Sequence, residues 1–90
     1  MLTIGDLGTL KGMQAWINSG QVWKMEGSIG RAAMEAIECG QVMLGRTGCR
    51  DYWGNYIPSR YEVKQGTKGS SGYVRELFGQ ARVKYLQSVK

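Results

Sequence analysis

Residues 21–45 read QVWKMEGSIGRAAMEAIECGQVMLG and contain the clearest helix signal in the chain. Ser28 is a good N-cap residue, and Gly40 suits the position just after a helix end. Between them, small and apolar residues recur at helical spacing: Ile29, Ala33, Ala36 and Ile37. The charged residues of the stretch fall on the opposite side. We therefore predict a short central helix with one small-residue face, around which the other elements pack.

A second helix is predicted before this stretch. Thr3 can cap it, with Asp6 three residues later, and the apolar repeat then indicates helix from about residue 3 to residue 19. The helix would reach residue 25 if it continued past Gly20. Trp16 and Trp23 are interpreted as core anchors lying over the alanine face of the central helix.

A small β-hairpin is predicted after the central helix. Gly54-Asn55, placed between aromatic residues, is typical of a two-residue type II′ turn. Pro58 lacks a backbone donor and should limit the hairpin to a few residue pairs. Residues 60–64 alternate in polarity, which indicates either a short strand or an extended linker.

A last helix is predicted after a glycine-rich loop over residues 65–72. Ser70 or Ser71 would cap it, and an apolar stripe would face the core. The stripe consists of Val74, Leu77, Phe78, Ala81 and Tyr85. Together these elements predict a single α+β domain over residues 1–90, mainly helical, with an N-terminal helix, a short central helix, a small β-hairpin and a C-terminal amphipathic helix.

Composition argues against several classes of protein. The chain of 90 residues has no histidine and only two cysteines, Cys39 and Cys49, so we expect reduced thiols, no metal site, no cofactor and no enzyme activity. We expect Cys39 to be partly packed at a helix end. The chain has no apolar run of the ~18 residues that a membrane span needs. We expect a soluble, unprocessed, intracellular protein with no membrane partner.

The cations concentrate in the second half of the chain. Residues 1–45 carry three Lys and Arg against four Asp and Glu, whereas residues 46–90 carry nine against three. Cations interleaved with aromatic rings can stack bases or anchor a protein interface. The predicted nucleic-acid or partner-binding residues are Arg50, Tyr52, Trp53, Tyr56, Arg60, Lys64 and Lys68. The alternative is that Tyr52, Trp53 and Tyr61 fold back to complete the core.

Two nucleic-acid motifs are weaker candidates. Gly66-Thr67-Lys68-Gly69 matches the GxxG loop of KH domains, but residues 61–64 read as extended where that domain needs a helix. A plain turn is favoured, although amides of residues 70–72 could hold a phosphate at the helix start. A helix-turn-helix with residues 28–39 as the recognition helix would present more carboxylates than cations to DNA, so it is disfavoured.

Two phrases, EGSIGRAAMEAIE (residues 26–38) and DYWGNYIPSRYEVKQGTKGS (residues 51–70), resemble small uncharacterised phage- and prophage-encoded proteins. The resemblance implies an accessory protein of a mobile element and transfers no functional residues. The leading prediction is a non-catalytic protein that binds nucleic acid or a host nucleoprotein complex through a basic aromatic hairpin. The alternative is a protein-only binder, either an inhibitor of a host enzyme or defence system or a structural virion component. The alanine and glycine faces would also suit a homodimer.

Overall fold

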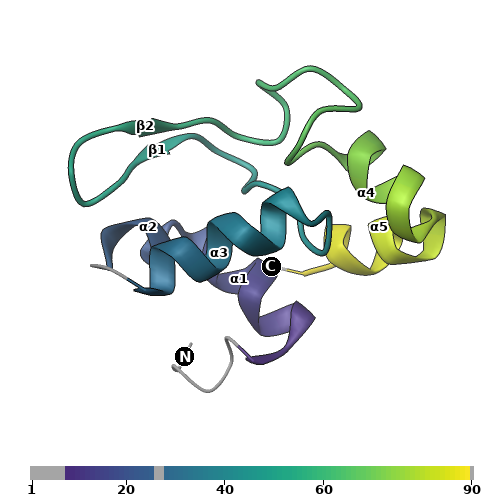
Figure 1. The fold of residues 1–90 in the computed structure, drawn as a ribbon, viewed down its shortest axis with the longest axis horizontal. Coiled ribbons are helices and arrows are strands. Elements are labelled where there is room, and N and C mark those ends of the chain that lie inside the picture. The colour runs from purple at the N-terminus through teal and green to yellow at the C-terminus, as the bar shows by residue number, and fades with distance from the viewer. Residues whose placement is uncertain (1–7, 26–27, 90) are drawn as a thin grey trace.

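The computed structural model of this protein describes residues 8–25 and 28–89 (Figure 1). The elements are α1 (Leu10–Ser19), α2 (Gln21–Lys24), α3 (Ser28–Glu38), β1 (Cys49–Arg50), β2 (Tyr56–Ile57), α4 (Ser71–Phe78) and α5 (Gln80–Gln87). The two strands pair antiparallel, and α4 and α5 lie at the opposite end of the molecule from the hairpin tip. The predicted mainly helical α+β fold with a small hairpin is confirmed. Within the described ranges, no helix has the length and apolar character needed to cross a bilayer.

The central helix α3 ends as its sequence predicts. Gly40 has a φ of +77° and donates its N–H to the Ile37 carbonyl, while the Gln41 N–H reaches back to the Ala36 carbonyl. This pair of bonds is a Schellman ending, which needs a residue such as glycine in the left-handed region. Ser28 is the first helical residue rather than the predicted N-cap, and the residue before it lies outside the described ranges.

The first helix among the described residues, α1, begins at Leu10. Thr9 has an extended backbone, and its side-chain oxygen accepts the Gly12 N–H at 2.9 Å, so Thr9 caps a helix that begins at Leu10. An unbroken helix from residue 3 is therefore wrong, and the predicted Thr3 cap lies outside the described residues. Gly20, with a φ of +79°, ends α1 and turns the chain into the separate helix α2.

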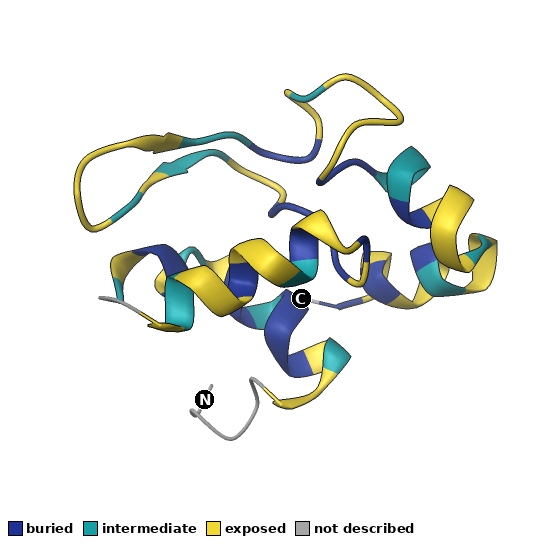
Figure 2. Cartoon of the chain, in the orientation of Figure 1, coloured by how far each residue is buried: buried dark blue, intermediate teal, exposed yellow. Residues whose placement is uncertain are grey.

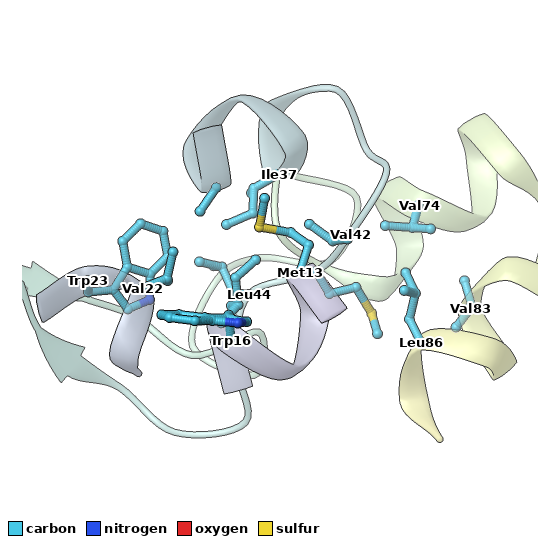
Figure 3. Packing of buried hydrophobic residues seen from close by; sticks show 13 residues of the cluster. Met13, Trp16, Val22, Trp23, Ile37, Val42, Leu44, Val74, Val83 and Leu86 are labelled. Carbon is cyan, nitrogen blue, oxygen red and sulfur yellow. The ribbon is translucent and has the colours of Figure 1, made fainter. Parts of the chain in front are cut away.

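A single core cluster extends from α1 to α5 (Figure 3). Trp16 and Trp23 are each 5% exposed, which confirms both as core anchors. Gln14 is also fully buried, although its side chain is polar. It donates to the Met43 carbonyl at 3.0 Å and accepts the Met43 N–H at 2.8 Å. One side chain thereby satisfies both backbone groups of a buried residue in the segment after α3.

The C-terminal helix is broken where one continuous helix was predicted. Gly79, with a φ of +93°, separates α4 from α5 and resets the helical phase. The residues of these helices that reach the core are Val74, Val83 and Leu86. Most of the predicted stripe is exposed instead, namely Leu77, Phe78, Ala81 and Tyr85 (Figure 2). The predicted buried stripe is therefore wrong beyond Val74.

Candidate binding surface at the hairpin tip

The hairpin tip is built on a turn over residues 51–54, DYWG. The Gly54 N–H donates to the Asp51 carbonyl at 3.1 Å. Asp51 Oδ1 accepts the N–H groups of Trp53 and Asn55 at 2.9 and 2.8 Å. An aspartate first and a glycine last, here with a φ of +86°, are typical of a three-residue loop that ends in a bulge. The predicted type II′ turn at Gly54-Asn55 is therefore wrong, because Asp51 opens the turn and Gly54 closes it.

Three aromatic side chains project from the tip. Tyr52, Trp53 and Tyr56 are 56%, 66% and 52% exposed. The rings of Tyr52 and Trp53 meet edge to face, with centroids 4.9 Å apart. The Tyr52 N–H donates to the Trp23 carbonyl at 2.7 Å and ties the tip to the end of α2. Tyr61 is exposed as well, so the alternative in which these rings complete the core is wrong.

Tyr56 is held between a cation and a carboxylate. The Arg50 guanidinium carbon lies 5.9 Å from the centroid of the Tyr56 ring, and the Tyr56 hydroxyl donates to Glu62 at 2.7 Å. Glu62 also accepts the Ser59 N–H at 2.7 Å. The Ser59 amide and then the Tyr56 hydroxyl lower the pKa of Glu62, and the bond to Glu62 raises the pKa of Tyr56. Gly48 leaves room for this contact, because a Cβ there would collide with the Tyr56 hydroxyl.

Replacing Glu62 with glutamine should lower the pKa of Tyr56. The Tyr56 pKa lies above its ordinary value of 10.0, so the stability that this group contributes is present below pH 10 and is lost as pH rises through the folded-state pKa. Glu62 has the opposite sign: its pKa lies below 4.5, so its contribution is lost as pH falls through the folded-state pKa. NMR titration of the tyrosine rings measures the shift, with E35Q as the control. An unchanged Tyr56 pKa in E62Q would contradict the contact.

The seven predicted binding residues fall into three groups. Four gather at the hairpin tip: Arg50, Tyr52, Trp53 and Tyr56. Lys64 and Lys68 are exposed on the loop that leads into α4, away from the tip (Figure 1). Arg60 is only 4% exposed. The prediction that all seven form one outward patch is therefore wrong, and the tip keeps four of them.

Arg60 is buried because its guanidinium bonds to groups of the protein interior. Its Nε donates to the Leu44 carbonyl at 2.8 Å, and its Nη2 donates to Asn18 Oδ1 at 2.9 Å. Its Nη1 has no hydrogen-bond partner within the described part of the chain. Burial lowers the pKa of Arg60, although an arginine stays charged at neutral pH. The backbone here is a turn, with the Glu62 N–H donating to the Ser59 carbonyl, and not the predicted strand or extended linker.

The GxxG loop is a capped turn in which several backbone amides already have hydrogen-bond acceptors. Ser70 Oγ accepts the N–H groups of Gly66 and Tyr73 at 3.0 and 3.2 Å, which confirms Ser70 as the N-cap of α4. The Gly72 N–H donates to Gln65 Oε1 at 2.9 Å. A phosphate at this helix start would have to displace the Gln65 side chain. The plain-turn interpretation therefore fits the geometry better than a phosphate clamp.

A cleft of about 300 Å³ opens beside the tip, between the hairpin, α2 and α3. The described residues that line it are Trp23, Met25, Gly30, Arg31, Met34, Asp51, Trp53 and Ile57. Its walls are mostly apolar, and Arg31 and Asp51 are its charged groups. This cleft could not be predicted from the sequence, because three separate segments form it. The one available signal was that Arg31 and Met34, three residues apart, both fall outside the buried face of α3.

Groups that could perform catalysis are not assembled in the described residues. The chain has no histidine, and no cluster of three or more Cys, Asp or Glu side chains within residues 8–25 and 28–89 could hold a metal ion. Cys39 and Cys49 are free thiols, and Cys39 is exposed rather than partly packed as expected. Burial raises the pKa of Cys49, so it stays a protonated and poorly reactive thiol at neutral pH.

Comparisons of the chain with known protein families, with characterised proteins and with solved structures gave no match. The resemblance to phage- and prophage-encoded proteins therefore stays a prediction.

Proposed function

We propose that this chain is a non-catalytic binding protein that holds a partner protein through the hairpin tip and the adjoining cleft. The observation that carries the proposal is the position of Trp53, which is 66% exposed and also forms a wall of the cleft. Exposed Trp, Tyr and Arg side chains contribute most of the energy of protein interfaces. Met25 and Met34 on the other walls can adapt to the shape of an inserted side chain.

The charges around the tip support a protein partner over nucleic acid. Among the described residues they are three cations and two carboxylates, namely Lys24, Arg31, Arg50, Asp51 and Glu62. This mixture of signs attracts a phosphate backbone less strongly than a uniformly basic patch would. The exposed lysines that could offset this, Lys64 and Lys68, lie on the loop before α4. A cleft near 300 Å³ is at the small end of ligand pockets and suits one large apolar side chain of a partner.

The resemblance to phage- and prophage-encoded proteins is the reason to seek the partner among host proteins. Inhibition of a host enzyme or defence system, or assembly into a virion, would each use a protein contact of this kind. A host-cytoplasmic location belongs to the same proposal.

Replacing Trp53 with alanine should reduce capture of the partner from nuclease-treated host lysate by about tenfold, because an aromatic anchor is lost from the centre of the contact. The fold should be unaffected, since this side chain packs little against the core. Y61A removes another exposed ring, outside the tip and the cleft, and serves as the matched control. Equal capture by W53A and Y61A would exclude the tip as the contact.

Binding to single-stranded nucleic acid is the second candidate. It is favoured by the exposed rings of Tyr52, Trp53 and Tyr56 beside Arg50 and by the net charge of +5. The test is fluorescence anisotropy with random oligonucleotides at several salt concentrations. Binding that falls steeply with ionic strength and disappears in W53A would replace the protein partner with nucleic acid. No detectable binding at about 50 mM salt would remove this candidate.

A further inference from the structure

The two charged residues described in the cleft at the hairpin tip differ in how far they are already hydrogen-bonded. Asp51 is one of the two charged groups among the described residues of the cleft, and its Oδ1 accepts the N–H groups of Trp53 and Asn55 inside the turn. Its Oδ2 lies 3.4 Å from Asn55 Nδ2. The other charged group, Arg31, is exposed and forms no ion pair or hydrogen bond with the residues that the structure describes. The carboxylate is therefore bonded within the protein, whereas the guanidinium is available to a ligand.

Two further charged side chains, Arg50 and Glu62, are grouped around Tyr56, which faces the opposite side of the hairpin from the cleft-lining Ile57. Glu62 accepts both the Tyr56 hydroxyl and the Ser59 N–H, so its oxygens are also engaged. Arg50 donates to the Gly54 carbonyl at 3.0 Å across the hairpin and keeps its positive charge beside the tip. A carboxylate entering with a ligand would find no described residue already paired with Arg31. A cation entering in its place would compete with the turn amides for Asp51 Oδ1.

We infer that the cleft recognises a protein segment in which one large apolar side chain is directly flanked by Asp or Glu. This inference rests on the proposed function and names the chemistry of the partner. The apolar side chain enters between Trp53, Met34 and Ile57, which line the cleft on different elements. The flanking carboxylate pairs with Arg31 at the rim, where a planar guanidinium can bond a carboxylate through two N–H groups. One carboxylate on the partner is enough to form this pair, so the partner does not have to be a polyanion such as a nucleic acid.

Three short capped peptides test the inference: Gly-Ser-Asp-Phe-Asp-Ser-Gly, the same peptide with Lys in place of Asp, and the same peptide with Ala in place of Phe. The full chain is titrated to about 1 mM peptide, because one buried ring gives affinity in that range. NMR shifts of the Trp indole N–H signals report binding. The acidic Phe peptide should bind about fivefold more tightly than its Lys counterpart, and the difference should shrink at high salt. The Ala peptide should bind weakest or not at all.

R31E should cancel or invert this preference. R75E makes the same charge change on α4, outside the cleft, and should leave the preference intact. Equal binding of the acidic and basic peptides, or an equal effect of R31E and R75E, would overturn the inference. Absence of any shift with the acidic Phe peptide would overturn it too. In each of these cases the proposed function still stands if W53A loses partner capture and Y61A does not, so the two failures are distinguishable.

Discussion

Replacing Arg60 with alanine is expected to lower the free energy of unfolding by about 3 kcal/mol. The Leu44 carbonyl loses the guanidinium that bonds it, and Asn18 Oδ1 loses one of its donors. A buried acceptor left without its partner costs about 1–3 kcal/mol, and the truncated side chain also leaves a cavity. Relief from burying a charge offsets part of this loss. Since domains of this size have unfolding free energies of roughly 5–13 kcal/mol, the change is large.

Urea unfolding followed by far-UV circular dichroism measures the effect of R60A. R60K keeps the charge but not the planar fork, so it should recover only part of the loss. K68A removes an exposed cation on the loop before α4 and should change stability by no more than about 0.5 kcal/mol. If R60A were as stable as K68A, the buried role of Arg60 would be wrong. Arg60 would then return to the set of binding residues that the sequence predicted.

Elements whose signals are local could be predicted from the sequence. The Schellman ending at Gly40 and the cap at Ser70 depend on residues within a few positions, and both are present. Gly79 was a local signal that the apolar periodicity concealed. A glycine inside a helix costs up to about 1 kcal/mol relative to alanine, and here it marks the break between α4 and α5. Because the helical periodicity starts anew after Gly79, the predicted apolar stripe cannot continue from α4 into α5.

Features that depend on distant residues could not be predicted. Arg60 bonds to side-chain and backbone groups 42 and 16 positions away, and nothing in its own neighbourhood distinguishes it from an exposed arginine. The burial of Gln14 depends in the same way on Met43, 29 positions away. The sequence was compatible both with an exposed Trp53 and with a Trp53 that completes the core. The choice between the two is decided by the turn at Asp51 and by the bond from Tyr52 to Trp23, which together fix the direction of the tip.

Replacing Gly69 with alanine is expected to destabilise the fold by about 3 kcal/mol, in the same range as R60A. Gly69 has a φ of +94°, a conformation that alanine adopts only with strain. An added Cβ would also lie 2.5 Å from Leu44 Cδ1, and Leu44 is a buried member of the core. The same two residues are joined by a bond from the Leu44 N–H to the Gly69 carbonyl at 3.1 Å. A displaced Leu44 would therefore also disturb the acceptor of Arg60.

Gly66 provides the matched control for Gly69, because both are glycines of the GxxG loop with a positive φ. A Cβ on Gly66 would meet no atom within 4 Å, so G66A should cost only the backbone strain, about 1 kcal/mol. The difference between the two unfolding free energies then measures the close packing of the loop on Leu44. Equal losses would mean that Leu44 moves aside freely. Partner capture should survive in both variants wherever they remain folded, since neither glycine lies at the hairpin tip, whereas a backbone clamp for nucleic acid would lose binding in both.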